Sequence, residues 1–360
     1  MIDIESIAKQ VRENCEIADA RSWGTYSLCT LLLKLRDMYR WERKLKPWES
    51  VNHSDVMAWI GEKENRWDLL ALHEFRNITI EGRDFSPFNI EEINVHLTPV
   101  NLLYGAGYVG TKPTFFLGKI EKKRQEVLKT SGVNIYILNE ELARDLLTFP
   151  AQLQTDNIIC RKEPIRYWLW DRLEEVNARS VKDENALSFA FDSYGLDVAR
   201  RKMPPSEIEE TMENLLNEEA ESYIHHEIGE WIERASFGFE WNELITCCSE
   251  GKAGHLVRGV KDILADTTDN GMLDHIVSNH KKGSLGFYVS QLKDLRRLLF
   301  PEILDSYLEF RKSGDWRHIE VARILGYNKA KGSAERIIRI YKEGKEKGSD
   351  WIKSEIEKIL

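Results

Sequence analysis

The chain has 360 residues, of which 42% are hydrophobic and 31% are charged, and its formal net charge is −9 at pH 7. This length allows two or three domains with a sizeable core, and the composition excludes a largely disordered chain. No apolar run approaches the roughly 18 residues of a membrane span, and no secretory signal is apparent at the N-terminus.

Residues 1–76 are predicted to form an N-terminal helical region. The segment 26–42 contains no Gly or Pro and is too long for an ordinary strand. A second helix is expected to begin with Ser54 as its N-cap. Its inward face is predicted to carry four apolar residues, Val56, Trp59, Ile60 and Trp67.

Residues 77–165 are predicted to form a small β-containing region. Short runs rich in β-branched and aromatic residues at 94–97, 113–117 and 133–138 are typical of strands. A helix is expected over 140–147.

The segment from Gly105 to Gly110 matches the pattern Gly-x-Gly-x-x-Gly of dinucleotide-binding proteins. That site requires a helix after the last glycine and an acidic strand end about 20 residues later. The residues after Gly110 are more typical of a strand, and the next acidic strand end lies 30 residues away, at Glu140. We therefore expect a glycine-rich turn and no nucleotide cofactor.

The second half of the chain is predicted to be helical. Residues 166–312 are expected to form a helical bundle, and 313–360 a basic C-terminal helical hairpin. The predicted helices of the bundle are 166–178, 205–235, 252–269, 271–281, 284–299 and 301–312. The predicted fold class is therefore mainly α, a multi-helix bundle with a small β-containing (α+β) region in the first half.

The strongest chemical signal is a segment rich in glutamate and histidine. Residues 203–233 contain ten glutamates and no Lys or Arg, and five of the nine histidines of the chain lie between His225 and His280. Carboxylates and imidazoles are ligands for metal ions and groups for proton transfer.

Helical projection selects among these residues. At 100° per residue, Ala220, Ile224, Ile228, Trp231 and Ala235 form the apolar stripe expected to face the core. Glu218, Glu221 and His225 line one flank of it, whereas Glu219, Tyr223, His226 and Glu230 are predicted to point toward solvent.

Two downstream segments could supply further ligands. His280 is predicted to project toward the core with its apolar neighbours. The next predicted helix carries a row of polar residues on the side opposite its apolar face. We expect this row to be solvated, unless the helix is packed between two layers. The row consists of His255, Asp262, Asp266 and Asp269.

The pattern Glu-x-x-Glu-x-x-x-His at 218–225 resembles the way helical di-iron carboxylate proteins present ligands. Those proteins use Glu-x-x-His on two helices, whereas here the spacing from Glu to His is four and no second copy occurs. The pattern His226-Glu-Ile-Gly-Glu230 is similar to the zinc-peptidase motif but lacks its second histidine. Neither resemblance implies membership of those families.

We expect a metal site formed by Glu218, Glu221, His225 and His280. The mixed nitrogen and oxygen ligands fit iron, manganese or zinc. The prediction is a metal-binding helical protein with oxidative or hydrolytic chemistry, although the sequence leaves open whether it is an enzyme. Its substrate or partner, a small molecule or a protein, also stays open.

The alternative is a non-enzymatic interaction protein whose acidic helix binds a basic partner. Its tail has the spacing of a helix-turn-helix, in which a short helix ends at Leu325-Gly-Tyr327 and a polar turn follows. Residues 311–360 hold 13 Lys/Arg and 8 Asp/Glu. Because the rest of the chain is acidic, nucleic acid is expected to bind only through residues 314–360.

The cysteines bear on the cellular compartment. The chain has five, an odd number, with no Cys-x-x-Cys pair. This pattern favours reduced thiols over a disulfide framework. We therefore expect a cytoplasmic protein.

Overall fold

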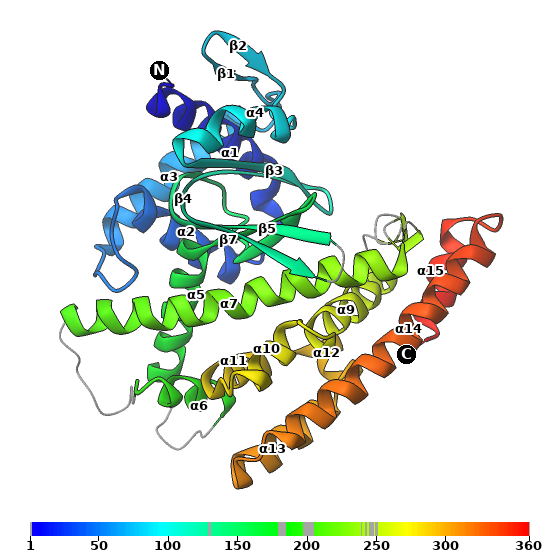
Figure 1. Ribbon diagram of the computed structural model, residues 1–360. Coiled ribbons are helices and arrows are strands. Elements are labelled where there is room, and N and C mark those ends of the chain that lie inside the picture. Colours follow the sequence, from blue (N-terminus) through cyan, green and yellow to red (C-terminus); the bar gives the residue numbers. More distant parts are fainter. Residues whose placement is uncertain are drawn as a thin grey trace. The chain divides into compact units, whose positions relative to one another are not determined.

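The computed structural model describes residues 2–128, 131–178, 185–196, 205–238, 240–241, 243–244, 248 and 251–359 (Figure 1). It is 65% helical, with a curled five-stranded sheet in the first half. The predicted mainly α fold with an α+β region is therefore confirmed. No helix in the described ranges has the length and apolar composition needed to cross a bilayer.

The chain divides into two compact units. Unit 1 comprises Met1–Arg124, Tyr136–Pro150 and Cys160–Trp170. Unit 2 comprises Gln125–Ile135, Ala151–Ile159 and Asp171–Leu360.

The strands are β1 (Ile78–Ile80), β2 (Arg83–Phe85), β3 (Leu102–Val109), β4 (Lys112–Leu128), β5 (Ser131–Arg144), β6 (Ala151–Gln154) and β7 (Asn157–Arg161). The first two pair as an antiparallel ribbon, and the other five form one sheet in the order β3-β4-β5-β7-β6. β3 and β4 are antiparallel, with Gly105 opposite Phe116.

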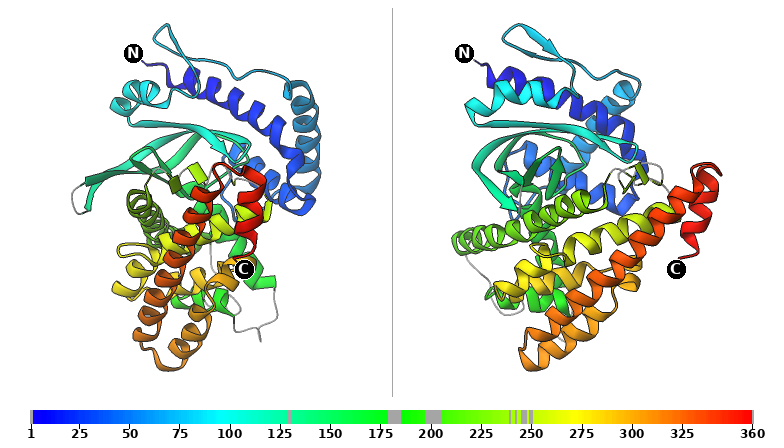
Figure 2. Two further views of the ribbon diagram at one scale, coloured as in Figure 1. Left: turned by 90° about the vertical axis from the view of Figure 1, so that its right-hand side faces the viewer. Right: turned by 45° about the vertical axis from the view of Figure 1, so that its right-hand side comes forward.

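The helices of the first half are α1 (Ile4–Ser22), α2 (Leu28–Glu42), α3 (His53–Leu70) and α4 (Ile90–Leu97), with two 3₁₀ turns at η1 (Trp23–Thr25) and η2 (Thr98–Val100). The apolar face of α1 packs against side chains of β3 and β4, as Figure 2 shows for the N-terminal helix above the sheet. α2 and α3 build a second cluster of buried residues, in which all four predicted inward residues of α3 are present. The N-cap of α3 is Asn52 instead of Ser54, because the Asn52 side chain accepts a hydrogen bond from the Ser54 amide (3.0 Å).

Two predictions for the first half are wrong. Residues 94–97 belong to α4, where Ile93 and Leu97 are buried one helical turn apart. The amide group of Asn94 bonds both backbone groups of Tyr104 at 2.8 Å, so this residue contacts a strand without being in one. Conversely, residues 140–144 continue β5. Pairing with the strands on both sides outweighs the helix propensity of this Glu-Glu-Leu-Ala-Arg sequence.

The glycine motif lies on β3 and in the turn to β4. Gly110 has a φ of 61°, which suits the turn between the two strands. A Cβ atom on Gly105 would lie 2.1 Å from the Phe116 ring. Packing across the hairpin therefore accounts for Gly105, and a strand follows the motif where a dinucleotide site requires a helix.

The helices of the second half are α5 (Lys162–Ala178), α6 (Ala186–Ser193), α7 (Pro205–Phe237), α9 (Gly251–Thr267), α10 (Met272–Ser278), α11 (Lys282–Gln291), α12 (Asp294–Leu299), α13 (Glu302–Ser313), α14 (Arg317–Gly344) and α15 (Ser349–Glu357). One predicted helix, 284–299, is in fact two. Leu292 and Lys293 are extended and separate α11 from α12. Apolar side chains of α9 to α15 form one extended cluster of buried residues in unit 2.

The prediction of a turn after Tyr327, which the alternative of a helix-turn-helix in the tail requires, is also wrong. α14 continues without interruption through Leu325 and Gly326. A Cβ atom on Gly326 would lie 2.4 Å from the Phe300 ring, so this glycine allows close packing of the helix instead of ending it. The chain turns later, between α14 and α15, at Gly348 with a φ of 91°.

The described cysteines, Cys15, Cys29, Cys160 and Cys248, form no disulfide. Cys247 lies outside the described residues.

Candidate functional site

The long helix α7 is covered on more than one side. Within unit 2 it packs against α9, α10 and β6, and it lies beside α9 and α10 in Figure 1. Its buried residues include four polar ones, Glu219, Ser222, Glu227 and Glu233. A projection with a single core-facing stripe therefore assigned the faces of this helix incorrectly.

Among the described residues, no three of the four predicted metal ligands form a group whose ligand atoms all lie within 4.8 Å of one another. Glu218 is exposed and forms an ion pair with Lys281. The His225 ring stacks on His275 with 4.0 Å between ring centroids, and its Nδ1 lies 2.8 Å from the carbonyl oxygen of Asn270.

The other two predicted ligands are Glu221 and His280. Glu221 is half-buried. His280 is exposed and stacks on Trp316, with ring centroids 5.5 Å apart, so its predicted projection toward the core is wrong. The Lys281 amide bonds the Ile276 carbonyl oxygen, which ends α10 before His280 and removes it from the apolar stripe of that helix.

A different group comes together. Among the described residues, His226, Glu230 and Asp262 are the set whose ligand atoms all lie within 4.8 Å of one another. His226 and Glu230 are one turn apart on α7, and Asp262 faces them from α9. The side chains are 19% and 15% exposed for the α7 pair and 30% exposed for Asp262, so the group is reachable from solvent without being on the open surface. The prediction that His226 and Glu230 point toward solvent is thus wrong.

Asp266 orients the His226 ring. His226 Nδ1 donates a hydrogen bond of 2.7 Å to Asp266 Oδ1, which leaves Nε2 3.4 Å from Glu230 Oε1. Asp266 is fully buried and also accepts a hydrogen bond from Arg296. Burial opposes charge on both members of the pair, but Asp266 raises the pKa of His226 well above its usual value. Arg296 and the imidazolium in turn lower the pKa of Asp266.

Lys261 provides the second positive charge. Its ammonium lies 2.8 Å from Glu230 Oε1. Although burial favours the neutral acid, Lys261 and His226 hold the pKa of Glu230 at about 2. Burial raises the pKa of Asp262. The group is therefore a nearly neutral network in which three cations, His226, Lys261 and Arg296, face three carboxyl groups, Glu230, Asp262 and Asp266.

One sequence feature could have identified this group. His226 and Glu230 are four residues apart, and so are Asp262 and Asp266, which gives two helices the same polar spacing. Helical projection dismissed both pairs as solvated faces. The packing of α9 against this face of α7 was needed to enclose them, and sequence periodicity does not report it.

Glu219 is a second buried carboxyl group on α7. It is 2% exposed and accepts hydrogen bonds from the hydroxyl groups of Tyr194 and Ser284. Burial raises the pKa of Glu219 from 4.5 to about 7. The folded protein therefore binds this proton more tightly than the unfolded chain does.

This shift predicts a pH-dependent stability. A raised pKa contributes stability below the unfolded value, and the contribution is lost as pH rises through the folded value. At about 1.4 kcal/mol per pKa unit, the ionisation of Glu219 should lower the free energy of unfolding by about 3 kcal/mol as the pH rises from 4 to 8. Glu219→Gln keeps an acceptor and removes the ionisation, so relative to wild type it should gain stability as pH rises. Urea unfolding at several pH values measures this difference, and Glu210→Gln, at an exposed position of α7, should show none.

The comparisons with known proteins identify the family. A model described as the C-terminal domain of a family of unknown function (DUF6866) matches residues 166–359. The corresponding N-terminal domain model matches residues 6–161. The chain therefore belongs to this family. No curated protein and no solved structure matches it.

Proposed function

We propose that this member of a family of unknown function binds a divalent metal ion, inside the multi-helix bundle that we infer for its second half. The ligands are His226, Glu230 and Asp262. The observation that carries the proposal is the convergence of one imidazole and two carboxylates, from two helices, within 4.8 Å.

The orientation of the histidine supports the proposal. In metal sites, a ligating histidine usually donates its other ring N–H to a carboxylate or carbonyl, which fixes the ring. Here Asp266 accepts from Nδ1 of His226, so Nε2 is the atom directed at Glu230. Arg296 holds Asp266 in turn.

The existing cations show how a metal would enter. In the metal-free protein, the His226 proton and the Lys261 ammonium balance the carboxylates. A divalent ion supplies the same charge, so binding would release the Nε2 proton and displace Lys261 toward solvent, where its side chain is already 28% exposed. Ligands about 2.1 Å from a metal lie about 3–4 Å from one another, which requires only small side-chain movements.

The ligand types favour iron, manganese or zinc. Three protein ligands leave at least one coordination position for water or substrate, which is typical of catalytic centres. Such a centre supports hydrolytic chemistry through a metal-bound water, or oxidative chemistry with a redox-active metal.

Metal titration of the untagged, chelator-treated protein tests the proposal. Calorimetry with Zn²⁺ and Mn²⁺, and visible absorption with Co²⁺, should show one ion per chain. Glu230→Gln and Asp262→Asn should each weaken binding by at least tenfold, because each removes one of three ligands. Circular dichroism establishes that the variants are folded.

The matched controls are Glu218→Gln and Glu221→Gln, which make the same chemical change on the same helix. Both should bind metal like the wild type. If these controls lost as much metal affinity as Glu230→Gln and Asp262→Asn, the metal would not be bound specifically by His226, Glu230 and Asp262. Absence of binding in a folded wild type would leave His226, Glu230 and Asp262 as members of a structural ion-pair network.

A further inference from the structure

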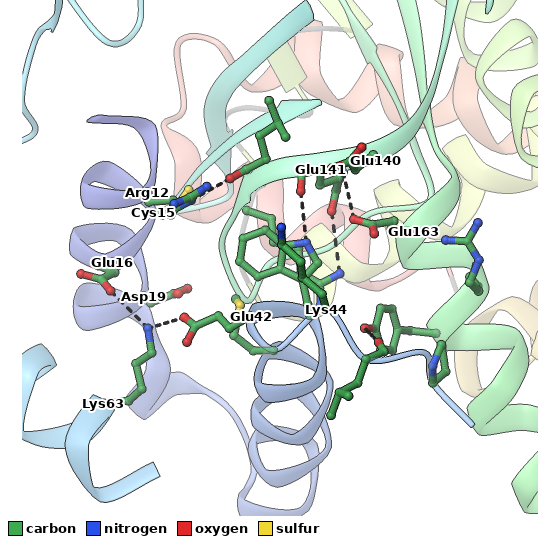
Figure 3. A pocket seen from close by; sticks show the side chains of 18 of the residues that line it. Arg12, Cys15, Glu16, Asp19, Glu42, Lys44, Lys63, Glu140, Glu141 and Glu163 are labelled. Atoms are coloured by element: carbon green, nitrogen blue, oxygen red, sulfur yellow. Dashed lines mark hydrogen bonds and ion pairs between the residues drawn. The ribbon is translucent and has the colours of Figure 1, made fainter. Parts of the chain in front are cut away.

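Unit 1 contains a cleft with a volume of about 570 Å³, bounded by α1, α2, α3, β5 and α5 (Figure 3). This volume is in the range of small-molecule sites. Part of its wall is apolar, formed by Met38, Trp41, Leu45, Pro47, Trp67 and Tyr167. The remaining wall is ionisable, and its charge balance indicates what the cleft can bind.

Four of the six carboxyl groups that line the cleft are already paired with cations. Glu16 pairs with both Lys63 and Arg66, Glu42 with Lys63, Glu140 with Lys119 and Glu141 with Arg161, so four cations face the four carboxylates. Figure 3 shows Lys63 between its two partners. These four carboxylates contribute little uncompensated negative charge.

The other two carboxyl groups, Asp19 and Glu163, both have a raised pKa. Asp19 accepts a hydrogen bond of 2.8 Å from the Leu146 amide, and burial, followed by the nearby Asp145, raises its pKa well above the usual value. Burial, followed by repulsion from Glu141, raises the pKa of Glu163 to about 7. Both shifts reduce the negative charge that these two carboxyl groups contribute at neutral pH.

Several cations in the cleft, in contrast, are not neutralised. Arg12 donates its Nε hydrogen bond to the backbone oxygen of Leu142 and, within the described residues, forms no ion pair. The exposed Lys44, held at a φ of 56°, likewise has no carboxylate partner in the described chain. The uncompensated charge of the cleft is therefore positive.

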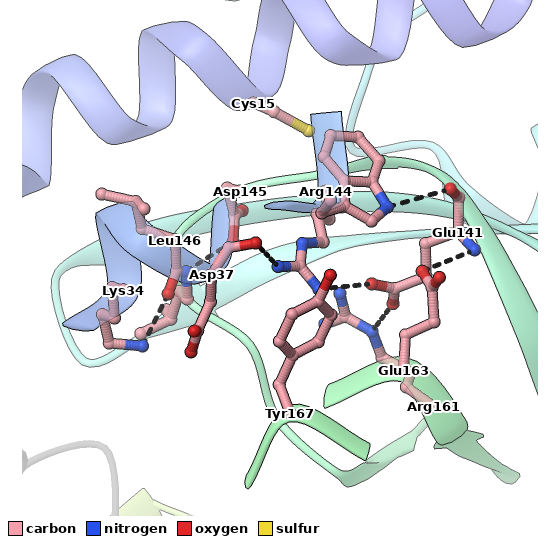
Figure 4. A network of polar contacts seen from close by, with 12 residues as sticks. Cys15, Lys34, Asp37, Glu141, Arg144, Asp145, Leu146, Arg161, Glu163 and Tyr167 are labelled. Atoms are coloured by element: carbon pink, nitrogen blue, oxygen red, sulfur yellow. Dashed lines mark hydrogen bonds and ion pairs between the residues drawn. The ribbon is translucent and has the colours of Figure 1, made fainter. Parts of the chain in front are cut away.

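Arg144 adds two buried donors. Its guanidinium lies over the rings of Trp41 and Tyr167, 5.2 and 5.0 Å from their centroids, and Nη2 donates to the backbone oxygen of Asp37 (Figure 4). Its Nε and Nη1 have no hydrogen-bond acceptor among the described residues, and the nearest carboxylate oxygen, on Glu141, is 3.8 Å from Nη1. Buried donors of this kind normally have a partner.

Trp67, on another wall of the cleft, also has a buried hydrogen-bond donor without an acceptor. Its side chain is 1% exposed, and its Nε1 donor also lacks an acceptor in the described part of the protein. Among the described lining residues, three buried donor atoms thus lack an acceptor, whereas two buried carboxylate oxygens, Glu16 Oε2 and Glu141 Oε2, lack a hydrogen-bond donor.

We propose that the cleft of unit 1 binds a small organic anion, a carboxylate or phosphate ester with an apolar body. The acceptor oxygens would complete the hydrogen bonding of Arg144 and balance the charge of Arg12 and Lys44. The cleft is far larger than an inorganic anion, and its apolar walls fit a hydrocarbon or aromatic body.

Calorimetric titration of the full chain with a matched panel tests this assignment. Benzoate and phenyl phosphate represent the two anion types, and benzamide and benzamidine are the neutral and cationic analogues of the same size. Acetate and inorganic phosphate lack the apolar body. We expect benzoate or phenyl phosphate to bind at least tenfold more tightly than every probe that lacks the negative charge or the apolar body. The tighter binder of these two anions identifies whether the cleft prefers a carboxylate or a phosphate ester.

Two variants locate the site. Lys44→Asn removes the charge, and asparagine tolerates the left-handed backbone; it should weaken anion binding severalfold. Arg144→Gln should weaken it by at least tenfold. Because Lys44 is exposed, its variant remains informative if Arg144→Gln does not fold. Lys331→Asn, at an exposed position of α14, is the charge-matched control and should bind like the wild type.

Three results would overturn the assignment. The first is no binding of either organic anion to the folded protein. The second is equal binding of benzamide and benzoate, which would exclude charge recognition. The third is binding that Lys44→Asn and Arg144→Gln leave unchanged, which would place the anion outside this cleft.

Discussion

Replacing Gly229 by alanine should destabilise the protein by about 3 kcal/mol. Gly229 is buried where α7 crosses α9, and a Cβ atom there would lie 2.0 Å from the backbone oxygen of Ala265. A clash with backbone cannot be relieved by a change of rotamer, so the helices must separate. The gain of about 1 kcal/mol in helix propensity on replacing glycine is smaller than this cost.

Urea unfolding of Gly229→Ala measures the effect. The matched control is Gly332→Ala in α14, where no atom lies within 4 Å of the new Cβ. That control should be stabilised by about 1 kcal/mol through helix propensity alone. Similar stabilities for the two variants would contradict the close crossing of α7 and α9, and with it the placement of Asp262 opposite Glu230.

Replacing Arg161 by methionine should destabilise unit 1 by about 3–5 kcal/mol. Arg161 is fully buried and donates from Nε to Glu141, whose side chain is 1% exposed. The variant leaves the Glu141 carboxylate buried, and its remaining ion-pair partner in the described part of the chain is Arg144, at 3.8 Å. Most of the loss comes from this uncompensated charge.

The double variant Arg161→Met/Glu141→Gln tests that reason. It removes both charges, so it should be more stable than Arg161→Met alone. Arg66→Met is the exposed control, because Arg66 also pairs with a glutamate but is 57% exposed; it should change the free energy of unfolding by less than about 1 kcal/mol. Equal losses in the single and double variants would show that packing of the Arg161 side chain, not charge, dominates.

Local sequence patterns predicted most helices of the second half and the strands at 113–117 and 133–138. They failed where a distant segment determined the conformation. The helix-forming sequence at 140–144 is a strand because it pairs inside the sheet, which also directs Glu141 and Arg144 into the cleft. Asn94 is helical because Tyr104, ten residues later, completes its hydrogen bonds.

The candidate sites differ in the same way. The segment rich in glutamate and histidine is evident from the sequence, and the proposed metal site uses two of its residues. The tertiary structure decided which two residues these are. Helix α9 covers the face of α7 that carries His226 and Glu230, so these residues are part of an enclosed network, whereas Glu218 is exposed. The cleft of unit 1 could not be predicted, since its charged residues come from α1, α2, α3, β5, α5 and the segment after α2, and are dispersed between Arg12 and Arg166.

The sequence by itself determined the mainly helical composition, the extent of most helices and the presence of a carboxylate- and imidazole-rich segment, because these depend on residues a few positions apart. Only the tertiary structure decided which charged groups are buried and paired. A helix has several faces, and its period reports the apolar one but not whether another layer covers the opposite side. For α7, that second layer turns a face predicted to be solvated into the candidate metal site.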